Sequence, residues 1–167
     1  MNSNTRYIAP FNGPIEIGLR ALVMLTKAFP SFFSIHQLVA FDYLLVHSDD
    51  VPDGPVGLHP KTPQRSGELL VRRKTLQQGL LLFISRGLIC QEYKQDGLRY
   101  AATELSGGFL DSLSSKYTIE LQNRADWVMG SFGDMPEPEL ERFMQNHLDK
   151  WGAEFAMESI LWQEDSK

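Results

Sequence analysis

The chain has 167 residues, of which 43% are hydrophobic and 22% are charged, an ordinary composition for a single globular domain. It has one cysteine, which excludes an internal disulfide, and no apolar run reaches the roughly 18 residues of a membrane span, so we expect a soluble, cytoplasmic protein without a membrane anchor. Residues 1–100 contain 11 Lys and Arg against 8 Asp and Glu, whereas residues 101–167 contain 5 against 13. This balance excludes a uniformly basic nucleic-acid binder and permits only a local basic face on the first part.

Three helices are predicted in the first half of the chain. Residues 14–28 begin with a proline, whose fixed φ suits a first helical turn, and they space apolar side chains at a helical period, with Glu16, Arg20 and Lys27 expected on the outer side. Ser34 and Gln37 form a capping box that opens a second, largely apolar helix ending near residue 47. A third helix is expected over residues 66–86, with a serine cap at its start and a glycine at its end.

The third helix is expected to have one apolar and one cationic side. Between it and the second helix, residues 48–63 include four prolines and two glycines, which predicts a long loop. The side chains expected to face inward are Leu69, Leu70, Leu76, Leu80, Leu81, Phe83 and Ile84. Those expected on the open side are Arg72, Arg73, Lys74, Gln77 and Gln78.

A β-hairpin is predicted directly after the third helix. Residues 88–94 and 98–102 alternate in polarity, and Asp96-Gly97 between them is a dipeptide suited to a tight turn. Cys90 lies in the first of these strands and is predicted to be a small buried residue rather than a nucleophile. Thr103 is expected to cap the helix that follows the second strand.

Two further helices are predicted in the acidic part of the chain. Ser114 or Ser115 opens the first, which ends at a break spanning residues 130–138. Residues 137–162 then form a strongly amphipathic, acidic helix.

The predicted fold class is mainly α with a small β-hairpin. Three helices, a hairpin and a returning helix follow the order of a winged helix-turn-helix domain, here with extra C-terminal helices. We therefore divide the chain into a winged-helix domain over residues 1–113, with its long 48–63 loop, and a C-terminal helical extension over residues 114–167. A helix-turn-helix joins its helices by a tight turn, and the 18 or so residues found here weaken the case for groove reading by the third helix.

Over about residues 12–130 the sequence resembles the middle component of bacterial ABC three-component conflict systems, a group that includes Lamassu-type anti-phage defence. The resemblance rests on extended similarity and on no catalytic motif. The runs that carry it are Gly13-Pro-Ile-Glu-Ile-Gly-Leu-Arg-Ala-Leu-Val, Phe41-Asp-Tyr-Leu-Leu-Val-His-Ser, Leu58-His-Pro-Lys-Thr-Pro-Gln-Arg-Ser-Gly-Glu-Leu-Leu-Val-Arg-Arg and Gly79-Leu-Leu-Leu.

The resemblance implies a non-catalytic adaptor in a hetero-oligomer with an SMC-like or RecN-like ABC ATPase and a separate effector, commonly a nuclease. DNA would be sensed only through the assembled complex. The sequence has neither a Walker lysine motif nor G-x-G-x-x-G, so an ATPase would be a partner, and no cofactor is expected. The alternative function is a homodimeric winged-helix transcription regulator that uses the third helix and the hairpin on DNA.

Two groups of residues are candidate contact sites. Six cations could contact DNA phosphates or an acidic partner surface: Lys61, Arg65, Arg72, Arg73, Lys74 and Arg99. The final predicted helix either packs on its own domain or docks on another chain, and its candidate partner contacts are Leu148, Trp151, Phe155 and Trp162.

A metal site is the least favoured function. The nitrogen and oxygen ligands that could converge across the proline-rich loop are His47, His59, Asp49, Asp50 and Asp53. No two of these residues have the spacing of metal ligands, so we expect His47 to help satisfy the end of the second helix and the aspartates to stabilise turns.

Overall fold

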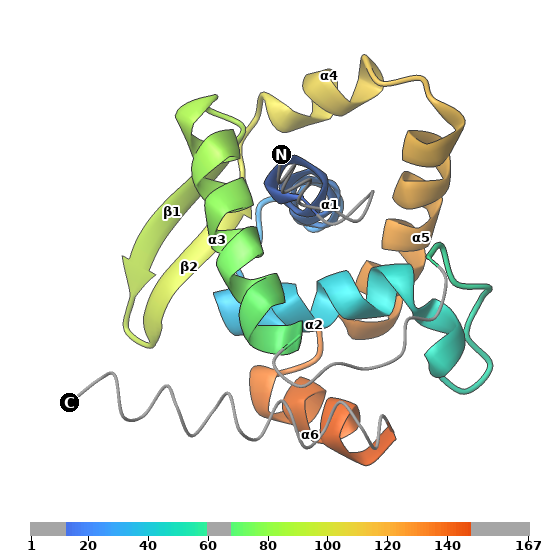
Figure 1. Cartoon of the computed structure of the whole chain (residues 1–167). Helices are drawn as coiled ribbons and strands as arrows, with labels where there is room; N and C mark the ends of the chain where they lie inside the picture. The colour runs from blue at the N-terminus through green and yellow to red at the C-terminus, as the bar shows by residue number, and fades with distance from the viewer. Residues whose placement is uncertain (1–12, 60–67, 148–167) are drawn as a thin grey trace, which may run out of the picture.

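The structure is a computed structural model that describes residues 13–59 and 68–147. Its fold is mainly helical with one small antiparallel hairpin, as the sequence predicted (Figure 1). The elements in chain order are α1 (Pro14–Lys27), α2 (Ile35–Val46), the 3₁₀ turn η1 (Ser48–Asp50), α3 (Glu68–Ser85), β1 (Ile89–Lys94), β2 (Gly97–Ala102), α4 (Ser106–Asp111), α5 (Lys116–Phe132) and α6 (Glu137–His147).

Helix α2 lies at the centre of the molecule, with α1, α3, α5 and α6 packed against it (Figure 1). All of its residues except His36 and Tyr43 are buried, which confirms the central position predicted from its apolar sequence. The capping box is also confirmed. Ser34 Oγ accepts a hydrogen bond from the Gln37 N–H at 3.1 Å, and Gln37 Oε1 accepts one from the Ser34 N–H at 2.9 Å.

Helices α1 and α3 cross at unusually short range because two glycines meet there. A Cβ atom added to Gly79 would lie 2.4 Å from the carbonyl oxygen of Pro14 and 2.8 Å from the Cα of Gly18. Since real side chains do not tolerate such contacts, glycine at position 79 is what lets the two backbones approach. On its other side α1 packs against α5, and α4 connects the hairpin end of the molecule to α5 (Figure 1).

The hairpin pairs β1 with β2 from Ile89–Ala102 to Lys94–Gly97. Its turn residues are therefore Gln95 and Asp96, one position earlier than the predicted Asp96-Gly97, and Gly97 begins β2 with a φ of +113°. The outer edge of β2 is also paired: Tyr100 exchanges two backbone hydrogen bonds with Phe33, of 2.8 and 2.9 Å. The hairpin is thus joined to the segment between α1 and α2.

Two side chains near the hairpin differ from prediction. Leu81 faces solvent with 61% of its surface exposed, because the buried stripe of α3 passes through Leu76, Leu80 and Phe83 instead. Cys90 is half-buried rather than buried, since β1 turns mostly exposed residues outward after Ile89.

The later helices share the core of the earlier ones. Ser115 caps α5 by accepting a hydrogen bond from the Thr118 N–H at 3.2 Å, as one of the two predicted alternatives required. Thr103 is not the N-cap of α4, which begins three residues later, but its hydroxyl accepts a hydrogen bond from the Leu105 N–H at 3.3 Å ahead of that helix and donates one to the Gly87 carbonyl at 2.6 Å. Residues of α5 and α6 belong to the same apolar cluster as those of α1 and α2. The winged-helix interpretation and the division at residues 113 and 114 stay predictions.

Candidate functional site

The structure places the cations that were predicted to form one surface in very different environments. Lys61 and Arg65 lie outside the described residues, as do the four candidate partner contacts Leu148, Trp151, Phe155 and Trp162. Lys74 is exposed and Arg73 is half-buried on α3. The expectation that Arg72 lies on the open side is wrong: it is 7% exposed, and its guanidinium turns inward toward a carboxylate of α2.

That carboxylate, Asp42, is the centre of a buried ion cluster. Its Oδ1 accepts from Arg20 Nε at 2.6 Å, and its Oδ2 accepts from Arg20 at 3.0 Å and from Arg72 at 2.5 Å. Burial alone would raise the pKa of Asp42, but the two guanidinium groups outweigh it and lower that pKa to about 2. The same carboxylate raises the pKa of Arg20 against the opposing effect of burial. The cluster joins α1, α2 and α3 through charge at the molecule's centre.

The loop after α2 is held against α5 by a histidine. His59 Nε2 lies 2.9 Å from the hydroxyl of Tyr117, and burial together with the nearby Arg20 charge lowers the pKa of His59 to about 4. The His47 ring packs on that of Tyr43 at a tilt of 50°, with centroids 4.9 Å apart, and the Tyr43 hydroxyl donates to Asp50. Over residues 13–59 and 68–147, no three His, Cys, Asp or Glu side chains come together as metal ligands would.

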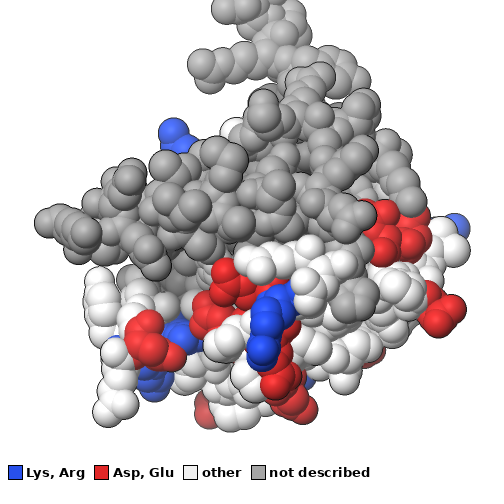
Figure 2. Space-filling view, turned by 90° about the horizontal axis from the view of Figure 1, so that it is seen from below, with Lys and Arg blue, Asp and Glu red and all other residues white. Residues whose placement is uncertain are grey.

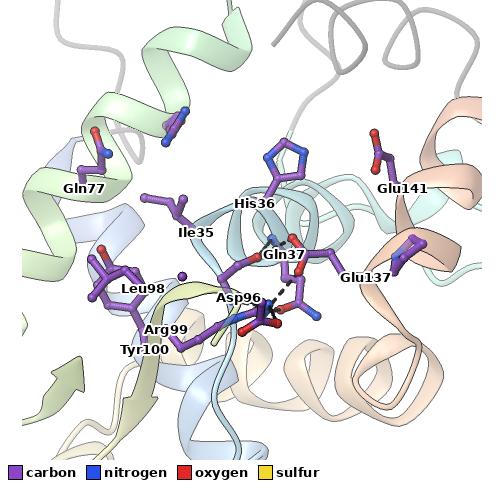
Figure 3. A pocket seen from close by; sticks show the side chains of 14 residues that line it. Ile35, His36, Gln37, Gln77, Asp96, Leu98, Arg99, Tyr100, Glu137 and Glu141 are labelled. Atoms are coloured by element: carbon purple, nitrogen blue, oxygen red, sulfur yellow. Dashed lines mark hydrogen bonds and ion pairs between the residues drawn. The ribbon is translucent and has the colours of Figure 1, made fainter. Parts of the chain in front are cut away.

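A groove of about 980 Å³ opens between α2, α3, the hairpin and α6 (Figure 3). Ile35, Leu98 and Tyr100 supply its apolar part. The polar side chains around it are Ser34, His36, Gln37, Arg73, Gln77, Asp96, Arg99, Glu137 and Glu141. A concave site with an apolar floor and polar walls of both signs suits a peptide segment better than a polyanion.

Arg99 lies at one end of this groove and is held by neighbouring side chains. Its side chain is only 12% exposed, donates to Gln37 Oε1 at 2.9 Å and pairs with Asp96 and with Glu137, the latter at 3.2 Å (Figure 3). Glu137 also accepts a hydrogen bond of 2.8 Å from Ser34 Oγ. A single carboxylate of α6 therefore connects the cap of α2 to the hairpin.

These interactions alter the prediction of phosphate contact. Of the four candidate cations that the structure describes, Arg72 and Arg99 already face carboxylates, and moving either to DNA would break an ion pair. The face around α6 carries acidic and basic side chains interspersed, with no continuous basic stripe on the part that is visible (Figure 2). Affinity for DNA depends on displacing counterions with clustered Lys and Arg, and the described residues visible on this face show no such cluster.

The expectation that Arg20 lies on the outer side of its helix is wrong, because Arg20 is 0% exposed and pairs with Asp42. Sequence reasoning also missed Asp42 and Glu137. Asp42 carried a readable signal, because it is a charged residue at a position where the helical period places apolar side chains. Burial of such residues requires a partner of opposite charge. Glu137 carried none, since it is one acid among several in an acidic segment.

Residues 10–154 match the family described as ABC-three component (ABC-3C) system Middle Component 2. The chain belongs to this family. The resemblance to a middle component noted from the sequence is thereby confirmed. No curated protein and no solved structure matches the chain. Among the helices of this middle component that the structure describes, none is long and apolar enough to cross a membrane.

Proposed function

We propose that this middle component is a non-catalytic adaptor that couples an SMC-like or RecN-like ABC ATPase to an effector, a nuclease, in a cytoplasmic anti-phage or anti-plasmid defence complex of the Lamassu type. The observation that carries the proposal is membership of an ABC three-component family over residues 10–154, nearly the whole chain. A middle component of a three-component system has two other components to contact. Its function therefore depends on surfaces that bind protein.

The groove is the surface that best suits such a contact. Its apolar part gives a partner side chain something to bury, and its rim of both charges can set the orientation of the bound segment. The start of α2, α3, the hairpin and α6 build it, so a bound partner would contact four separate parts of the sequence at once. Binding of one partner at such a site would affect several elements of the fold together.

The ionisable side chains of the core support a scaffolding role. Asp42 accepts hydrogen bonds from two arginines, and His59 is hydrogen-bonded to a tyrosine. The low pKa of each keeps it in one protonation state near neutral pH, whereas a general acid or base needs a pKa near the operating pH. Both groups thus suit the stabilisation of the fold.

Co-expression with the neighbouring operon products, followed by mass determination of the intact complex, tests the proposal. We expect a stable assembly with a large ABC ATPase. Gln77→Trp should fill the groove and weaken that assembly, whereas Gln91→Trp, on the exposed face of β1, should leave it unchanged. A free homodimer that ignores those products and retains short duplex DNA would overturn the adaptor proposal in favour of a regulator.

A further inference from the structure

The outward side of α3 is an exposed apolar stripe. We call it the α3 outer face and define it by Val71, Lys74, Gln78, Leu81, Leu82 and Ser85. Val71 is 67% exposed, Leu81 61% and Leu82 37%. These positions fall on one side of the helix at 3.6 residues per turn, opposite the buried Leu76 and Leu80. The stripe is about 21 Å long at a rise of 1.5 Å per residue.

The charges on and beside this face are positive. After Glu68, α3 contains no Asp or Glu, while Lys74 lies on the face and Arg86 follows the helix, both exposed. In contrast, α5 and α6 display exposed acids such as Glu120, Asp126 and Glu139. An acidic amphipathic segment would therefore be attracted to α3 and repelled from α6, whose three glutamates face one arginine, whereas the acids of α5 are balanced by Lys116 and Arg124.

The chain itself contains a segment of that chemistry after α6. Residues 148–167 include five acids against two lysines. Their apolar residues Leu148, Trp151, Phe155 and Trp162 recur at steps of three, four and seven, a helical spacing. From 148 to 162 the stripe would be about 21 Å long as a helix, the same as the α3 outer face.

We propose that the α3 outer face is the docking site of the chain's own C-terminal segment, residues 148–167, in the free protein. The leucines and valine of α3 would be buried against the tryptophans and phenylalanine, and Lys74 and Arg86 would meet the acids. The segment follows directly after α6, and α3 and α6 both pack on α2 and both form walls of the same groove. A partner helix could reach α3 only by displacing this segment.

Tryptophan emission tests the proposal in the full chain. Trp127→Phe removes the one other tryptophan, so Trp151 and Trp162 become the only reporters. We expect blue-shifted emission and weak acrylamide quenching that do not depend on protein concentration. Leu81→Glu should shift the docked-to-free ratio about tenfold or more toward free, since it removes a buried leucine and adds a desolvated charge. Lys74→Glu should act in the same direction and more weakly at high salt.

The matched control is Ile119→Glu, which changes an isoleucine of α5 that is 51% exposed and lies away from α3. It should leave the quenching unchanged. Equal effects of Leu81→Glu and Ile119→Glu, or strong quenching already in the parent, would overturn the proposal. Protection that grows with protein concentration would assign the face to a second copy, and protection only on addition of the ABC ATPase would assign it to that partner. Docking of the segment is tested on the chain alone, so its failure is distinguishable from a failure of the three-component complex to assemble.

Discussion

Replacing Asp42 with asparagine should be among the most damaging isosteric changes in this protein. The substitution keeps the shape of the side chain but leaves Arg20 and Arg72, which are 0% and 7% exposed, without a counter-charge. Breaking a buried ion pair from one side costs about 3–5 kcal/mol, a large part of the about 5–15 kcal/mol by which a domain of this size is stable. We therefore expect a severely destabilised but foldable variant.

Urea unfolding at several pH values measures the effect. The pKa of Asp42 is about 2 in the folded state, below its ordinary value of 3.8, so the folded state binds fewer protons at this carboxylate than the unfolded state does. Its contribution, about 2 kcal/mol by linkage, is complete above pH 4 and is lost as the pH falls toward 2. The wild type should lose that stability over this interval, and Asp42→Asn should not.

Asp126→Asn is the control for charge without burial. Asp126 pairs with Lys27 at 3.1 Å, but its side chain is 60% exposed, so the loss should stay within about 0–1 kcal/mol. If Asp42→Asn costs less than about 1 kcal/mol at pH 7, or behaves like the control, the buried cluster does not stabilise the fold as argued.

Three further changes separate packing, titration and helix attachment. Gly79→Ala should destabilise the protein by more than about 1 kcal/mol, because the added Cβ would lie 2.4 Å from a backbone oxygen. Gly130→Ala, which has open space around it in α5, should instead stabilise the protein by about 0.4–1 kcal/mol. Equal effects of the two substitutions in thermal melts would contradict the close crossing of α1 and α3. The pKa of His59 falls from 6.5 to about 4 on folding, so stability should decline as the pH drops from 6.5 toward 4, and His59→Gln should flatten this slope in urea titrations. Glu137→Ala should speed hydrogen exchange in α6 more than in α2, because the pair with Arg99 is lost; uniform acceleration would mean that α6 does not detach on its own.

Most local structure follows from the sequence because its signals are short-range. The capping box at Ser34 and the cap at Ser115 each act within three residues, and both are present as predicted. The hairpin position was also readable, although its turn was displaced by one residue, since Asp96 and Gly97 are each acceptable on either side of the turn. The family assignment rests on extended similarity, which needs no tertiary structure.

The direction in which charged side chains turn was decided only in three dimensions. Arg72 lies next to other cations in the sequence, which predicts a solvent-exposed side chain, yet in the fold it donates to the Asp42 carboxylate, thirty residues away on α2. Likewise Arg99 reads as a wing cation, but the folded chain brings Glu137 to it from a distant helix. Helical periodicity determines that a side is apolar, whereas the pairing of buried charges depends on which helices meet. That meeting is set by packing of the whole core, including a glycine contact between α1 and α3 that no local pattern contains.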